Sequence, residues 1–182
     1  MAALALLSWW LVNQAPLDPS ASVEPPPRHE PDYTMQRFVV QRFAADGVLR
    51  MEIEGDTALH FPDTDTLQIE NPRVRAIGTD GRVTRATAER ALANGDGSEV
   101  QLLVRARVVR EATAQEEAIE FSSEFLHFFS RVERVRSHLP VTVRQGATAV
   151  RAAGMEYDHL ARVVDLQGRM RAVFAPPAKG QP

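Results

Sequence analysis

The chain has 182 residues, of which 44% are hydrophobic and 25% are charged, a balance typical of one folded domain with short flanking segments. It contains no cysteine, which excludes disulfides, thiolate catalysis and cysteine-based metal sites. Its formal net charge of −3 gives no indication of nucleic-acid binding.

The first 15 residues, MAALALLSWWLVNQA, form an apolar run that contains a tryptophan pair. As a helix, about 12–15 residues would reach roughly 18–23 Å, which is shorter than a bilayer core of about 30 Å. The length suits a signal-peptide core, but no basic residue precedes the run and no clear cleavage site follows it. A disordered tail of this composition would favour aggregation. We therefore interpret residues 1–15 as the outer part of a transmembrane anchor that begins before Met1, with Trp9 and Trp10 at the membrane interface.

Residues 16–31 are rich in proline, serine and charge, which predicts a stiff, extended linker. The folded domain is expected to occupy residues 32–175, and residues 176–182 are expected to form a disordered tail. The twelve prolines and ten glycines of the chain indicate many turns rather than long helices.

The folded region begins with short strands that have a hydrophobic period of two. In VLRMEIEG, the apolar residues alternate with charged ones, and Gly55-Asp56 is predicted to end the strand. The next strand, TLQIE, is predicted to end at Asn71-Pro72, and RVRAI is followed by a turn at residues 79–81 and a further strand from Val83.

The longest alternating run is VQLLVRARVV, which follows a predicted turn at residues 94–98. It places on one face Val100, Leu102, Val104, Ala106 and Val108. Only two stretches have a helical composition: residues 87–94 predict one or two turns at most, and residues 110–119 suit a helix or a hairpin loop equally well. Strands at spacings of about 8–12 residues with turns between them predict an all-β sandwich or jelly roll.

Residues that could carry chemistry do not form a recognisable motif. No pair among the five histidines has the i, i+4 spacing of a helical zinc site, and there is no nucleophile elbow or phosphate-cradling loop. Asp63 and Asp65 lack the glycine and distal glutamate of a calcium loop, so we interpret them as a polar turn. Glu116 and Glu117 are interpreted as a solvated charge pair. We expect no catalytic residue, no metal site and no cofactor.

Large apolar side chains on facing strands allow two interpretations. They form either an ordinary sandwich core or the lining of a sandwich that opens to admit an acyl chain, in which burial gains about 0.8 kcal/mol per CH₂. Periodicity does not separate these two possibilities.

Several short motifs occur in an order that resembles the LptC family of lipopolysaccharide export proteins, over roughly residues 31–174. They are PDYTMQRF, Asp46-Gly47, Phe61-Pro62-Asp63, Asn71-Pro72-Arg73, Ser123-Glu124-Phe125-Leu126, Pro140-Val141, Gly154-Met155, Tyr157-Asp158 and Leu166-x-Gly168. One departure is Val104, where the family pattern has a glycine, and it concerns local sheet geometry.

The resemblance implies a twisted, open β-jelly roll of OstA-like type, built from antiparallel strands and preceded by a single N-terminal transmembrane helix. Such a protein is a single-pass inner-membrane protein with its domain in the periplasm, and it is not an enzyme. It accepts lipopolysaccharide, through its lipid A part, from the LptB/LptF/LptG transporter at its N-terminal edge and anchor. It then passes the lipid to LptA at its C-terminal edge. Open sheet edges are templates for strand addition, which fits this role.

The resemblance also suggests site residues, for which core packing or a plain turn is the alternative. Candidates for lipid contact in an apolar groove are Met51, Ile53, Leu67, Ile69, Leu102, Ile119, Phe121, Phe125, Val143 and Met155. Candidates for the partner interface are Gly47, Gly154, Leu166 and Met170. Gly154→Arg is expected to weaken association with LptA while leaving the fold intact.

Two other functions compete with this one. The first is a periplasmic structural adaptor with a closed, dry core that binds protein partners only. The second is a small β-sandwich enzyme or carbohydrate-binding module, which the low aromatic content of 7% disfavours.

Overall fold

The computed structural model describes residues 29–78, 80–158, 160–161 and 163–174, and these form antiparallel strands without a helix. The predictions for residues 1–15 and 176–182, and for most of the linker, lie outside the described residues. Within the described residues, the structure holds no helix with the length and apolar content of a membrane-crossing segment. The strands are β1 (Tyr33–Phe43), β2 (Leu49–Phe61), β3 (Thr66–Glu70), β4 (Arg73–Ile77), β5 (Val83–Thr87), β6 (Arg90–Asn94), β7 (Glu99–Arg110), β8 (Ile119–Phe129), β9 (Arg134–Ser137), β10 (Val141–Gln145), β11 (Thr148–Ala152), β12 (Gly154–Asp158), β13 (Val163–Gln167) and β14 (Arg171–Val173).

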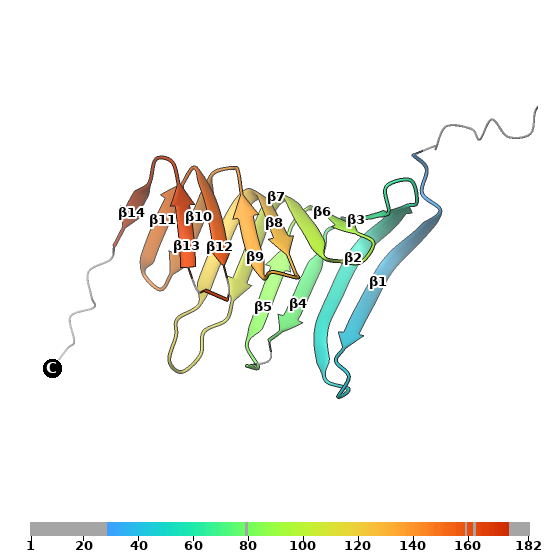
Figure 1. Cartoon of the computed structure of the whole chain (residues 1–182), viewed down its shortest axis with the longest axis horizontal. Coiled ribbons are helices and arrows are strands. Elements are labelled where there is room, and N and C mark those ends of the chain that lie inside the picture. The colour runs from blue at the N-terminus through green and yellow to red at the C-terminus, as the bar shows by residue number, and fades with distance from the viewer. Residues whose placement is uncertain (1–28, 79, 159, 162, 175–182) are drawn as a thin grey trace, which may run out of the picture.

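Four long strands, β1, β2, β7 and β8, run through two layers of the molecule. The first half of β7 pairs with β6 and its second half pairs with β5. In the same way, β8 pairs with β10 and then β9, and β2 pairs with β4 and then β3. The first layer therefore holds β3, β6, β9, β12 and β13, and the second holds β4, β5, β10, β11 and β14 (Figure 1). The expected all-β antiparallel architecture is confirmed.

The long strands bend where they cross from one layer to the other. On β7, Val104 and Arg105 have φ values of 62° and 52°, and the register with β8 shifts there. On β2, Gly55 lies at the crossing, where an added Cβ would lie 2.7 Å from the Ile69 side chain and 2.8 Å from the Phe38 ring. The prediction that Gly55-Asp56 ends the strand is therefore wrong. The glycine lets β2 pass close to the core and continue to Phe61.

The two layers face each other across one buried apolar cluster. Its members alternate with outward-facing charged residues along each strand, as the period of two predicts. The cluster consists of Ala58, Ile69, Ala91, Leu102, Ala106, Phe121, Leu126, Val135, Val141, Val143, Ala152 and Met155.

The two stretches of helical composition have no helix. Residues 90–94 form β6, which lies between β3 and β7 and buries Ala91, so the prediction of a helical turn there is wrong. Pairing on both sides overrides the weak helical preference of such a short segment. Residues 111–118 form the loop between β7 and β8, which is the second of the two alternatives for that stretch.

Candidate functional site

One end of the molecule is formed by β1, which pairs with β2 alone among the described strands. Its other side is an open sheet edge in both layers. Large apolar residues are exposed on it and on the turn that follows: Tyr33, Val39, Val40, Phe43 and Val48. An open edge with apolar side chains favours addition of a strand from another chain.

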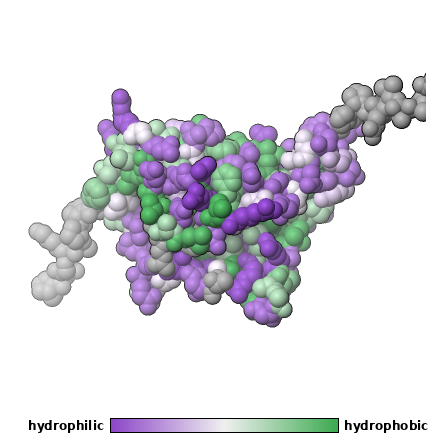
Figure 2. Space-filling view, in the orientation of Figure 1, coloured by the Kyte–Doolittle hydropathy of each residue, from purple (hydrophilic) through white to green (hydrophobic). Residues whose placement is uncertain are grey.

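The opposite end has two open edges, one in each layer. Among the described strands, β13 pairs only with β12, and β14 only with β11. Large apolar residues are exposed here too, at Leu160, Val163, Met170, Val173 and Phe174. Val132, in the turn between β8 and β9, is the remaining exposed large apolar residue of the described part. Hydrophobic residues reach the surface around this end in Figure 2.

Eight of the ten predicted groove residues meet in the interior between the layers. Ile69, Leu102, Phe121, Val143 and Met155 belong to the buried cluster, and Ile53, Leu67 and Ile119 pack against it. Met51 is half-buried on β2, opposite Ala76. The exposed fraction of Phe121 is 2% and that of Met155 is 1%, so these side chains are packed in the structure described here.

Phe125 does not face the interior. Its ring lies 4.5 Å from the His138 ring and 6.1 Å from the His127 ring, in a hollow on the outer side of the first layer that Arg136 also lines. The prediction for this residue is wrong because β8 changes layers after Ser123. Phe121 and Ser123 face inward before the crossing, whereas Leu126 does so after it.

The predicted interface residues lie in different environments. Gly47 is in the β1–β2 turn with a φ of 80°, a backbone conformation that favours glycine. Leu166, on edge strand β13, packs against the core, and Met170 is exposed in the turn before β14. Met170 and Leu166 therefore lie at the end formed by β13 and β14.

Gly154 is buried inside the first layer, since β12 pairs with β9 on one side and β13 on the other. An added Cβ would lie 3.0 Å from the backbone oxygen of Ser137. From this position we expect Gly154→Arg to disturb the fold as well as any interface. The residue allows two strands to approach closely and is not on an edge.

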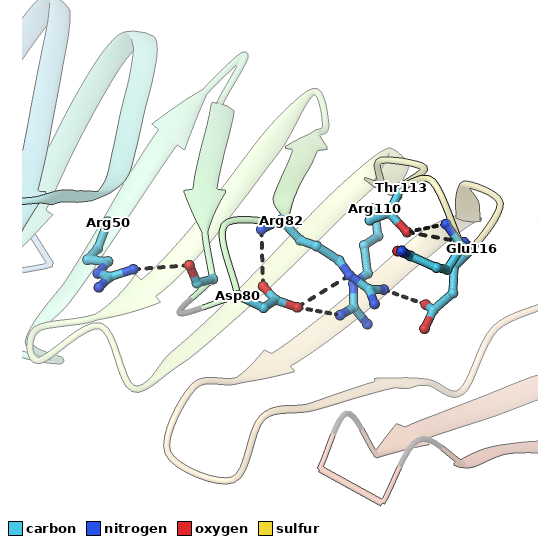
Figure 3. A network of polar contacts seen from close by, with 8 residues as sticks. Arg50, Asp80, Arg82, Arg110, Thr113 and Glu116 are labelled. Carbon is cyan, nitrogen blue, oxygen red and sulfur yellow. Dashed lines mark hydrogen bonds and ion pairs between the residues drawn. The ribbon is translucent and has the colours of Figure 1, made fainter.

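A polar network joins the β4–β5 loop to the end of β7 and the β7–β8 loop (Figure 3). The side chain of Arg82 forms an ion pair with Glu116, and its Nε lies 3.3 Å from Asp80 Oδ2. Arg110 Nη2 lies 3.5 Å from the same Asp80 oxygen. The Thr113 hydroxyl accepts hydrogen bonds from the backbone N–H groups of Gln115 and Glu116. The prediction that Glu116 and Glu117 form a solvated charge pair is thus partly wrong, because Glu116 forms an ion pair with Arg82.

This network perturbs the titration of its members. The Arg82 backbone N–H and then the charges of Arg82 and Arg110 hold the pKa of Asp80 below its ordinary value. The Glu116 carboxylate raises the pKa of Arg82, with a smaller contribution from the charge of Asp80. Sequence reasoning missed both arginines. For Arg110 the alternation in the sequence was a usable signal, because Arg110 stands two residues after Val108 and four after Ala106, on the side of the strand predicted to face inward.

A second polar group lies at the β1 end. His60 Nδ1 lies 2.7 Å from Asp32 Oδ1, its Nε2 lies 3.4 Å from Asp65 Oδ1, and Tyr33 stacks on its ring. The hydrogen bond to Asp32 raises the pKa of His60. Asp63 and Asp65 lie in the predicted turn, and among the described residues there is no cluster of histidine and acidic side chains suited to a metal ion.

Comparison of the sequence and the structure with known proteins identifies a family and a solved structure of similar fold. The family model described as lipopolysaccharide-assembly, LptC-related, matches residues 1–175. The chain is structurally similar to LptH, described as the LptA-homologous periplasmic component of the lipopolysaccharide transport device of Pseudomonas aeruginosa. The TM-score is 0.58 at 14% identity, over 69% of this chain and 95% of that one. No curated protein sequence matches the chain.

Proposed function

This chain belongs to the LptC-related family of lipopolysaccharide-assembly proteins, and on that premise we propose that it relays lipopolysaccharide between two partners. It accepts the lipid from the inner-membrane LptB/LptF/LptG transporter at the β1 end and passes it to LptA at the β13/β14 end. The N-terminal residues anchor it in the inner membrane as a single-pass protein, and the domain works in the periplasm without catalysing a reaction.

The observation that carries this proposal is the pair of open ends. Five large apolar residues are exposed at the β1 end and five at the β13/β14 end, with one elsewhere in the described part. Edge strands of this kind add strands from a similar fold, and a head-to-tail arrangement would join the apolar interiors of successive domains. Acyl chains of lipid A could then cross the aqueous periplasm with little exposure to water.

Lipid entry requires the two layers to separate, because the interior side chains are packed against one another. Each CH₂ transferred from water into the interior gains about 0.8 kcal/mol, which offsets the loss of contacts between the layers. Ile53, Ile69 and Phe121, from three strands, are among the residues that would exchange contacts with each other for contacts with acyl chains.

The same packing favours a second candidate function, a structural adaptor with a closed, dry core. Leu126, Met155 and Phe121 each have an exposed fraction of 2% or less. In this case the open ends bind LptA and the transporter, and lipid does not enter.

Photo-crosslinking distinguishes the two functions. A benzoylphenylalanine replacing Phe121 faces the interior, whereas one replacing Arg144, an exposed residue on the neighbouring strand β10, faces outward. In the full chain co-expressed with the transporter, we expect lipopolysaccharide adducts at position 121 and few at position 144. Adducts only at position 144 would contradict the relay, and retained LptA binding with no adduct at position 121 would support the adaptor.

A further inference from the structure

Two arginines occupy positions on the inner face of the second layer. On β7, Ala106 is buried and Val108 packs against the core, and Arg110 is the next residue of that series. On β5, Ala86 packs against the core and Thr84 pairs with Arg110, and Arg82 precedes Thr84 by two residues. The exposed side-chain fractions are 16% for Arg82 and 14% for Arg110. Holding two cations at the rim of an apolar interior is costly unless anionic groups accompany them.

The two carboxylates that accompany these arginines are held differently. Asp80 accepts a hydrogen bond of 3.0 Å from the Arg82 backbone N–H, in a turn that Arg50 also fixes by donating to the Gly78 carbonyl. Glu116 lies in the β7–β8 loop, and 45% of its side chain is exposed. Glu116 can therefore leave Arg82 by a movement of a loop side chain, whereas Asp80 is part of the turn.

The surroundings of the arginine pair suit an amphiphile. A hollow of about 170 Å³ lies beside Arg82 and is lined by the backbone turn at Asp80 and the loop residues up to Thr113. On the neighbouring strand β8, Ile119 pairs with Arg110 and Phe121 pairs with Val108, and the Phe121 ring lies 5.3 Å from the Tyr157 ring of the opposite layer. The cationic group of Arg110 thus lies one inward-facing position beyond the apolar pair of Val108 and Phe121.

We propose that Arg82 and Arg110 bind the phosphate of an anionic amphiphile whose acyl chains enter between the layers near Phe121 and Tyr157, and that Glu116 occupies this site when it is empty. The proposal rests on the relay function and adds to it the group that recognises the lipid. A guanidinium donates two parallel hydrogen bonds to a phosphate, and a phosphate monoester carries about −1.5 to −2 charges at neutral pH.

The first test compares lipids with and without phosphate. The full chain carrying benzoylphenylalanine in place of Phe121 is exposed to lipid A with both phosphates or to dephosphorylated lipid A. The double variant Arg82→Gln, Arg110→Gln is expected to lower the yield with the phosphorylated lipid by about ten-fold and to leave the yield with the dephosphorylated lipid unchanged. Arg85→Gln is the matched control, since Arg85 lies on the outer side of β5 in an ion pair with Glu111.

The second test uses inorganic phosphate alone and does not depend on lipid entry. Titration of the full chain, followed by the NMR signals of the arginine side-chain Nε–H groups, should shift the signals of Arg82 and Arg110 and leave that of Arg85 in place. Glu116→Gln removes the competing charge and keeps both arginines, so it should bind phosphate several-fold more tightly. Glu117→Gln, next to it and beside Gly146, should not.

The outcomes separate this inference from the relay itself. Interior adducts whose yield is independent of phosphate and of both arginines would overturn the inference and leave the relay standing. An absence of interior adducts with phosphate-dependent shifts at both arginines would overturn the relay and leave an anion site that takes free phosphate. If phosphate shifts neither arginine signal, or if the Glu116→Gln variant binds phosphate no more tightly than the wild type, the proposed anion site is contradicted.

Discussion

At the scale of single residues, Val104 has the least favourable backbone conformation for its type. Its φ of 62° lies in the left-handed region, where a β-branched side chain is rarely found. The position at which the family resemblance led us to expect a glycine is therefore the bend of β7. The Val104 carbonyl accepts a hydrogen bond of 3.0 Å from Glu89 N–H, which a glycine would keep.

Val104→Gly is therefore expected to stabilise the fold. Relief of the left-handed conformation contributes about 1–2 kcal/mol, and the greater freedom of glycine in the unfolded chain offsets about 0.5–1 kcal/mol of that gain. Urea unfolding of the full chain measures the difference. Val109→Gly, in the straight part of β7, should destabilise, and a similar loss in both variants would show that the bend does not favour glycine.

His60 gives the β1 end a pH dependence. Asp32, Asp65 and Tyr33 are the titratable groups that contact it, and the hydrogen bond to Asp32 raises its pKa. A histidine whose pKa is higher in the folded state contributes stability fully below its unfolded pKa of about 6.5, and this is lost as the pH rises through the folded pKa.

The difference in unfolding free energy between the wild type and His60→Gln should thus be largest below pH 6.5 and should shrink as the pH rises. Chemical denaturation at a series of pH values measures it. His138→Gln, whose ring packs against Phe125 on the outer side, serves as a control. A His60→Gln difference that grows with pH would contradict the assignment.

At the scale of elements, the open edge strands are where the proposed partners would bind. Val163 begins β13 with an exposed fraction of 56%, and Val132 is similarly exposed at 48% in a turn away from both ends. A lysine at an exposed position changes folding stability little, but a charge at an apolar edge opposes pairing with another chain.

We expect Val163→Lys to weaken binding of purified LptA to the full chain by about ten-fold, which is about 1.4 kcal/mol, with an unchanged unfolding midpoint. Val132→Lys should leave binding as it is. Equal binding by both variants would remove β13 from the interface. A substitution at the buried Gly154 would be a poorer test, because a loss of folding stability would itself lower the measured binding.

The crossings of the long strands explain which element predictions failed. Where a long strand bends from one layer to the other, the alternation of inward and outward positions shifts by one residue. This happens on β8, where Phe121 and Leu126 both face inward although they are five residues apart. Buried serines brace this crossing. Ser123 Oγ lies 3.1 Å from Ser137 Oγ, and the Ser137 hydroxyl donates to the Phe125 carbonyl at 2.7 Å.

At the scale of the whole molecule, the chain runs from an open edge at β1 to open edges at β13 and β14, with one apolar interior between them (Figure 1). The proposed relay uses all three parts, because lipid would enter at one end and leave at the other. In the proposed relay, the arginine pair stands at the loop end of the inward-facing series on β5 and β7, where a phosphate could stay near the surface while acyl chains remain inside.

The sequence by itself determined the strand-rich fold class and several turn positions, because alternation and turn residues act within a few neighbouring residues, and the order of its short motifs indicated the family. The shared face of Ile53 with its strand neighbours and that of Ile69 with Leu67 followed from that alternation, and both residues lie in or against the interior. Only the tertiary structure decided that Phe125 faces outward, that Gly154 is enclosed, and that Arg82 and Arg110 meet Asp80 and Glu116. The physical reason is that alternation relates the faces of a single strand, whereas the bends between layers and the meeting of distant loops depend on packing across the whole domain.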